Sequence, residues 1–164
     1  MKSYNVYRSS RPGVLECAVF ENGKIILNTK MVKEPSAPVL IETANISLRS
    51  DYDTDQTLIP GVTKRTVYYS GTNLKFADIR WNRDETYTID FGDDTFDAVR
   101  EDKQSFTFTK EGKRVGAISR AGGIAAIREN GVSFDPSYRA EYDESLSQKE
   151  LIMILVFPIL YFGF

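Results

Sequence analysis

A short basic segment, Lys110-Glu111-Gly112-Lys113-Arg114, contains the residue types that could hold an anion. The Glu-Gly pair predicts a tight hairpin turn, so Lys110, Lys113 and Arg114 would meet at one tip, with Lys103 one strand earlier. Such converging cations could bind a phosphate group, and the alternative is an ordinary solvated hairpin end. Near anionic lipid each cation would add about 1 kcal/mol, so attachment would be weak and sensitive to salt.

A second basic pair, Lys64-Arg65, is also a candidate for anion binding. Neighbouring residues in a strand point to opposite faces of the sheet. Only one of these two side chains is therefore expected to face a ligand.

Aspartates at alternate positions are the pattern of a calcium-binding loop. Asp51, Asp53 and Asp55 have the spacing of the first three ligands of an EF-hand loop, but Gln56 stands where the loop needs Gly, and Val62 stands where it needs a bidentate Glu. We therefore interpret this segment as an acidic loop.

A second acidic cluster, Asp90, Asp93, Asp94 and Asp97, surrounds Gly92. It would ligate a cation only if the turn brought its oxygens together, and hairpin solubility explains it equally well. We expect no metal site and no cofactor.

The composition excludes several kinds of catalysis within this single chain. The sequence has no His and one Cys, which rules out Ser-His-Asp and Cys-His nucleophile systems, His-ligated zinc and imidazole acid–base chemistry. A hydrolase with paired carboxylates stays available, although nothing in the sequence selects a pair.

Gly122-Gly123 lacks the context of a phosphate-binding loop and is interpreted as a strand bend or bulge.

The overall charge argues against nucleic acid as a partner. The chain of 164 residues has 21 Lys and Arg against 23 Asp and Glu, whereas nucleic-acid binding domains usually carry a clustered basic excess. The first residues contain no apolar secretory segment, so we expect a cytoplasmic protein.

Cys17 lies in an apolar run, and we expect a small buried hydrophobic residue there in preference to a reactive thiol.

The elements that must position these residues are mainly strands. Apolar and polar residues alternate over residues 44–49, 77–82 and 87–91, and each alternation predicts a strand with one buried face. Asn22-Gly23 and Asn130-Gly131 favour tight hairpins, because both positions of such a turn need positive φ.

Turn-forming residues recur along most of the chain, at intervals of roughly eight to twelve residues. This spacing is typical of an all-β sandwich or barrel. No linker or low-complexity segment divides the sequence. We expect one domain over residues 1–164, with about twelve short antiparallel strands between residues 4 and 143.

After Asp143 the pattern becomes helical. Two overlapping capping boxes, Ser145 with Gln148 or Ser147 with Glu150, predict that a helix begins here. In a capping box, the two side chains satisfy backbone N–H groups that the first helical turn leaves without partners.

The segment that follows, residues 151–164, has no charged residue and no polar face. Its fourteen residues would rise about 21 Å as a helix, less than the roughly 30 Å of a bilayer core, and Pro158 would kink or end the helix. We therefore expect no transmembrane segment. A helix over residues 146–162, apolar on all sides, must be surrounded by lipid or by protein. Its length favours burial in protein over a membrane tail anchor, and a closed antiparallel β-barrel would surround it.

This arrangement resembles the tubby C-terminal-like superfamily, which includes the LURP-one-related proteins and the phospholipid scramblases. The residues that carry the resemblance are Ser137-Tyr138-Arg139-Ala140-Glu141-Tyr142-Asp143, then Ser145-Leu146-Ser147-Gln148-Lys149-Glu150, then the apolar tail through Phe157-Pro158 to Phe164. The chain looks most like the small single-domain bacterial members. It lacks the long N-terminal extension of tubby proteins and the cysteine cluster associated with scramblases.

The resemblance implies a fold in which the barrel encloses its own C-terminal helix, and a binding module in preference to an enzyme. Tubby proteins hold phosphoinositide headgroups with basic residues, and scramblases are associated with phospholipid and calcium. We therefore expect a non-enzymatic protein that binds anionic phospholipid headgroups peripherally at the inner membrane surface, through Lys103, Lys110, Lys113, Arg114, Lys64 and Arg65. The alternative is a protein–protein interaction or scaffold domain without lipid binding; a carboxylate-dependent hydrolase is a third hypothesis.

Overall fold

The computed structural model describes residues 1–32, 38–51, 60 and 63–162, and at residues 31–32, 63–64 and 161–162 it describes the backbone alone. Within these residues the strands form one 13-stranded antiparallel sheet. The strands are β1 (Lys2–Ser9), β2 (Val14–Glu21), β3 (Lys24–Val32), β4 (Val39–Thr43), β5 (Ser47–Ser50), β6 (Thr63–Tyr69), β7 (Lys75–Trp81), β8 (Thr86–Asp90), β9 (Thr95–Asp102), β10 (Ser105–Lys110), β11 (Lys113–Arg120), β12 (Ile127–Glu129) and β13 (Val132–Tyr142).

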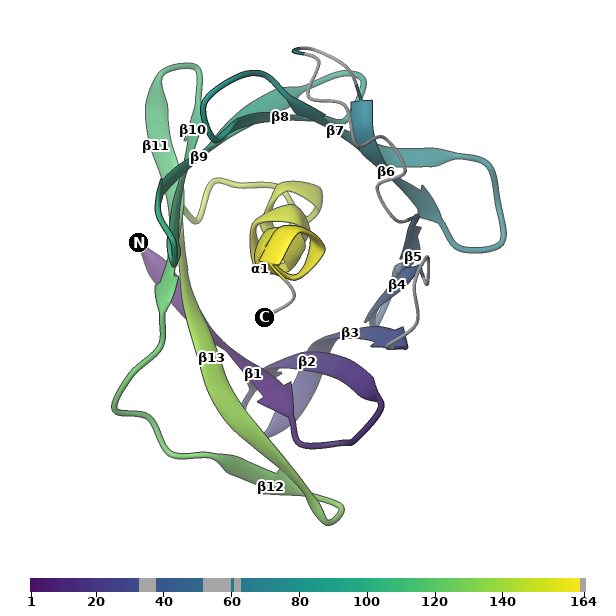
Figure 1. Cartoon of the computed structure of the whole chain (residues 1–164), viewed down its shortest axis with the longest axis vertical. Helices are drawn as coiled ribbons and strands as arrows, with labels where there is room; N and C mark the ends of the chain where they lie inside the picture. Colours follow the sequence, from purple (N-terminus) through teal and green to yellow (C-terminus); the bar gives the residue numbers. More distant parts are fainter. Residues whose placement is uncertain (33–37, 52–59, 61–62, 163–164) are drawn as a thin grey trace.

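The sheet closes into a barrel because its first strand pairs with its last. Each strand from β1 to β10 pairs with the next one in sequence, β11 pairs with β13, and β13 pairs with β1. The short strand β12 pairs only with β13 and lies outside the ring, so the closed barrel has 12 strands (Figure 1). The predicted closed antiparallel barrel is confirmed. Closure leaves the barrel wall without an exposed sheet edge.

One long strand connects the barrel to its outer appendage. The first residues of β13 pair with β12, and its residues Tyr138–Tyr142 pair with β11. Pro136 stands at the register shift opposite Tyr7, a position where the missing N–H of a proline is tolerated. Gly122-Gly123 lies in the irregular connection between β11 and β12, so the expectation of a bend or bulge within a strand is wrong.

The three tight turns anticipated in the sequence are confirmed. Asn22-Gly23, Glu111-Gly112 and Asn130-Gly131 each link two paired strands, and both residues of every pair have positive φ, between 51° and 77°. A turn with this geometry matches the twist of the strands that it joins.

The helix α1 (Gln148–Phe162) runs through the centre of the barrel (Figure 1). It begins with the capping box of Ser147 and Glu150: the Ser147 N–H donates to the Glu150 carboxylate at 3.0 Å, and the Glu150 N–H donates to the Ser147 hydroxyl at 3.2 Å. Ser145 instead donates to Asp143, from both its N–H and its hydroxyl. The helix continues through Pro158, so it does not end there.

The helix supplies the centre of the hydrophobic core. All residues from Ile152 to Val156, and Phe157, are at most 3% exposed. The Phe157 ring packs against three rings from two strands, Tyr87 of β8 and Phe106 and Phe108 of β10, with centroids 4.9 to 5.7 Å apart. No helix among the described residues is long and apolar enough to cross a membrane.

The two ends of the barrel carry different turns, because successive strands run in opposite directions. We call the end at which α1 begins the helix-start mouth. It consists of the turns at residues 22–23, 44–46, 70–74, 91–94 and 111–112, together with the linker 143–147. The remaining turns, including the one that joins β9 to β10, lie at the opposite mouth.

Candidate functional site

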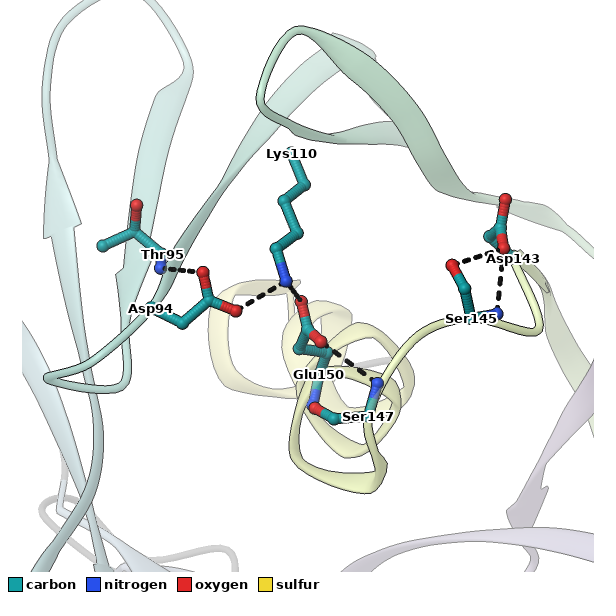
Figure 2. Close-up of polar contacts among 7 residues, drawn as sticks. All are labelled: Asp94, Thr95, Lys110, Asp143, Ser145, Ser147 and Glu150. Atoms are coloured by element: carbon teal, nitrogen blue, oxygen red, sulfur yellow. Dashed lines mark hydrogen bonds and ion pairs between the residues drawn. The ribbon is translucent and has the colours of Figure 1, made fainter.

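Lys110 is held by two carboxylates and does not face solvent as a free cation. Its Nζ lies 2.6 Å from Asp94 Oδ2 and 3.0 Å from Glu150 Oε2, and Figure 2 shows the ammonium group between the two. Glu150 is 4% exposed. The hydrogen bonds to Asp94 and then to Glu150 raise the pKa of Lys110 above its usual value. Lys110 therefore joins β10 to the start of α1 and to the turn before β9.

The other two cations of the hairpin remain accessible. The Lys113 side chain is 75% exposed, and its Nζ lies 3.8 Å from Asp143, a loose contact. Arg114 is exposed and makes no ion pair with any residue that the structure describes. Hydrogen bonds from Ser145 lower the pKa of Asp143, so this neighbour is a carboxylate that partly offsets Lys113. The hairpin thus presents two cations at its tip.

The remaining basic candidates lie elsewhere. Lys103 is exposed in the turn between β9 and β10, at the opposite mouth from the Lys113 hairpin. Arg65 is half-buried in β6, where its Nη1 donates to the buried Ser50 hydroxyl at 3.2 Å. Lys64 lies in the same strand, within a register shift, and its side chain lies outside the described residues. The structure therefore does not bring Lys103, Lys64 or Arg65 to the hairpin tip.

The acidic cluster around Gly92 is used in separate contacts. Asp90 Oδ2 lies 2.9 Å from Arg80, Asp97 accepts the Thr88 hydroxyl at 2.9 Å, and Asp93 is exposed. No group of metal-ligating side chains gathers within the described part of the chain.

The first aspartate of the acidic loop has a partner of its own. Asp51 forms an ion pair with Arg49 at 2.9 Å, whereas Asp53 and Asp55 lie outside the described residues.

The single cysteine is a buried side chain. Cys17 is fully buried, and burial raises its thiol pKa to about 12, so it is the small buried hydrophobic residue that was expected.

Most of the exposed large apolar side chains lie around the helix-start mouth. Four large ones are exposed among the described residues, and three of them, Met1, Ile25 and Leu74, lie at or beside this mouth, while Leu40 lies on the barrel wall. Leu74 is 67% exposed, in a turn that is otherwise polar. The sequence interpretation missed these residues, although an apolar residue in a polar turn is a signal that was available.

Each of the three exposed apolar residues at the mouth is followed or preceded directly by a lysine. The pairs are Met1-Lys2, Lys24-Ile25 and Leu74-Lys75, and all three lysines are exposed. Lys75 has a partner, Asp78, at 3.3 Å. The mouth therefore combines apolar groups with long cationic side chains, the combination found where proteins meet a membrane surface.

A pocket of about 210 Å³ opens between α1 and the barrel wall at the same mouth. One side consists of helix residues and the other of the start of β1, part of β3 and the turn after β4. The lining residues are Tyr4, Ile26, Leu27, Thr43, Ala44, Asn45, Gln148, Leu151, Ile152 and Leu155. None of them is charged, and the sequence interpretation did not identify this site.

No protein-family model, curated protein or solved structure matches this chain, and the resemblance to the tubby C-terminal-like superfamily stays a prediction.

Proposed function

We propose that this protein is a non-enzymatic module that binds membrane surfaces rich in anionic phospholipid, with the helix-start mouth toward the lipid. One observation carries the proposal: exposed apolar side chains and exposed cations share that mouth. Ile25 and Leu74 would enter the interfacial region, while Lys113 and Arg114 would contact phosphate groups. A cytoplasmic protein would meet such lipid at the inner membrane surface.

The free energies of binding expected from the cations and from the apolar residues indicate that both must act together. Each cation near an anionic surface contributes about 1 kcal/mol, and burial of a Leu or Ile side chain contributes roughly 1.5–3 kcal/mol when complete. Exposed carboxylates at the same mouth offset much of the charge of these cations: Glu21, Asp93, Glu111 and Glu144. Neither contribution alone gives stable attachment, so binding requires both anionic lipid and insertion of the apolar residues.

Two of the described carboxyl groups, Asp102 and Asp143, differ from the general acid of a hydrolase, which supports the non-enzymatic part of the proposal. A carboxylate-dependent hydrolase needs a general acid whose pKa is raised. Asp102 and Asp143 have pKa values shifted in the opposite direction, each chiefly by a hydrogen bond from a nearby backbone N–H. Glu150, the most buried carboxylate near the mouth, is paired with Lys110.

Co-sedimentation with vesicles tests the proposal. Vesicles of phosphatidylcholine alone are compared with vesicles that contain 30% phosphatidylglycerol, at low and at physiological salt. We expect binding only to the anionic vesicles and weaker binding at the higher salt concentration. Reversing two cations with Lys113→Glu and Arg114→Glu should lower the partition coefficient by at least about tenfold, since each cation contributes about 1 kcal/mol.

Matched variants distinguish this mouth from the rest of the surface. Leu74→Asn should weaken vesicle binding, whereas Leu40→Asn, at an exposed residue of the barrel wall, should not. Lys103→Glu, at the opposite mouth, is the control for the charge reversals. Equal effects of Leu74→Asn and Leu40→Asn would refute the proposed orientation. Absence of binding to every vesicle would refute lipid attachment and leave a protein–protein interaction or scaffold role to be tested.

A further inference from the structure

The pocket at the helix-start mouth lies on a defined face of α1. Gln148, Leu151, Ile152 and Leu155 line it, and their spacing of three and four residues places them together on one side of the helix. The barrel contributes apolar residues opposite them, Ile26 among others. The pocket therefore has a continuous apolar wall on two sides and is open at the mouth.

The polar groups of the pocket lie at its rim. Asn45 and Gln148 are exposed, and neither side chain forms a hydrogen bond with another residue that the structure describes. The two hydroxyl groups of the lining residues are already used. The Thr43 hydroxyl donates to the Ile46 carbonyl and accepts from the Ile46 N–H, and the Tyr4 hydroxyl donates to the Glu21 carboxylate. The rim can therefore bond to a polar group of a ligand, whereas the apolar interior cannot.

From this distribution, we propose that the pocket binds the hydrocarbon chain of a single-chain amphiphile, with the polar end of the amphiphile at the rim beside Asn45 and Gln148. An uncharged interior disfavours a charged group, because nothing there would compensate its lost hydration. A water molecule needs two to four polar partners, which the apolar walls do not offer. A flexible alkyl chain carries no charge and needs no hydrogen-bond partner, so it suits this interior.

The size of the pocket limits the length of chain that it can hold. A cavity of about 150 Å³ with apolar walls binds benzene. The volume here, about 210 Å³, is larger by a few methylene groups. The interior should therefore accommodate roughly eight carbons, by comparison with that cavity.

The inference does not depend on vesicle binding, because a free amphiphile in solution could occupy the pocket. The chain could also come from a membrane lipid. Both sources have the same chemistry, an alkyl chain attached to a polar group, and the experiment below separates them.

Titration of the full-length protein with 1-hexanol, 1-octanol, 1-decanol and 1-dodecanol, followed by the methyl resonances of Ile26 and Leu151, tests the proposal. We expect saturable binding of one molecule, with affinity rising about fourfold per added methylene while the chain still enters the pocket. The increase should stop at about eight carbons, the pocket's capacity by comparison with the benzene cavity. Affinity that rises without limit, or resonances that do not shift, would overturn the proposal.

Two tryptophan variants provide the matched comparison. Ala44→Trp places a large ring on an exposed turn residue that lines the pocket, and should lower the affinity for decanol at least tenfold. Asn73→Trp adds a comparable ring at an exposed position of the same mouth but outside the pocket, and should leave the affinity unchanged. Equal affinities of the two variants would place the alcohol elsewhere and overturn the assignment.

The source of the chain is identified by repeating the measurement with bicelles that contain phosphatidylglycerol. Shifts of Ile26 and Leu151 with both decanol and bicelles would show that a membrane lipid delivers its chain to the pocket. Shifts with decanol alone would support a free amphiphile as the occupant. The proposed membrane function can fail in the vesicle assay while decanol still binds, so the two failures are distinguishable.

Discussion

The two faces of α1 are packed in different ways. One face, with Glu150, Ile154 and Phe157, meets β8 to β11 through an ion pair, a close backbone approach and a group of aromatic rings. The opposite face, which includes Leu151 and Leu155, borders the pocket. We call these the packed face and the pocket face.

The difference follows from the side chains of the barrel wall. Strands β8 to β10 point large rings at the helix, such as Phe106 and Phe108, and these rings reach Phe157. Strand β3 contributes the shorter side chains of Ile26 and Leu27. A central helix cannot contact a wide barrel equally on all sides, so the wall with smaller side chains leaves a gap. The packed face therefore contacts the wall most closely, whereas the pocket face borders the space that the proposed ligand would occupy.

The largest expected effect comes from removing both faces at once. Deletion of residues 151–164 should unfold the protein, because it removes the buried segment from Ile152 to Leu160 that fills the barrel. Far-ultraviolet circular dichroism and the dispersion of amide NMR signals measure the outcome. A soluble truncated protein with a cooperative unfolding transition would show that the helix is not the core.

A pair of alanine substitutions measures the difference between the faces directly. Phe157→Ala should lower the free energy of unfolding by about 3–5 kcal/mol, because a fully buried ring leaves a cavity among three other rings. Leu151→Ala, on the pocket face, removes a half-buried side chain beside an existing gap and should cost about 1 kcal/mol. Denaturant unfolding measures both. Equal losses would contradict the distinction between a packed face and a pocket face.

A feature of this fold could be predicted from the sequence when the residues that form it lie close together along the chain. The strand alternation, the hairpin turn at Asn22-Gly23 and the capping box of Ser147 and Glu150 depend on residues close in sequence, and they were predicted. The apolar tail had to be enclosed, and that requirement predicted the closed barrel.

The site could be predicted less well, because its contacts are distant in sequence. Lys110 was expected to face an anion, but it pairs with Asp94, 16 residues away, and with Glu150, 40 residues away. The pocket depends on how closely each wall approaches the helix, which no local pattern encodes. Leu74 was different, since an apolar residue within a polar turn was visible in the sequence.

Adding a methyl group to the barrel wall tests how closely the wall packs against the packed face of the helix. In Gly116→Ala, the new Cβ would lie 2.9 Å from Ile154 Cδ1 and 3.0 Å from the Glu141 carbonyl oxygen. We expect a loss of about 1–3 kcal/mol in the free energy of unfolding, because a packed interior does not accept extra volume without strain.

The strain in Gly116→Ala can be assigned by a double-mutant cycle. Ile154→Val removes the Cδ1 atom nearest to the added methyl group. The double variant should therefore lose less stability than the sum of the two single variants, by an amount outside the measurement error of denaturant unfolding. Strict additivity would mean that the helix does not press against β11 at this point.

The smallest effect concerns the linker that leads into α1. Hydrogen bonds from Ser145 lower the pKa of Asp143 in the folded protein, so the ionised carboxylate favours folding. This contribution is complete above the unfolded pKa, near 3.9, and is lost as the pH falls through the lower folded value. Asp143→Asn should therefore lower the melting temperature slightly at pH 7, and the difference from the unsubstituted protein should shrink below pH 4. Glu144→Gln, at the exposed neighbouring carboxylate, is the control and should show no such dependence. A difference that persists unchanged at pH 3 would mean that the linker is stabilised by its shape and not by the charge of Asp143.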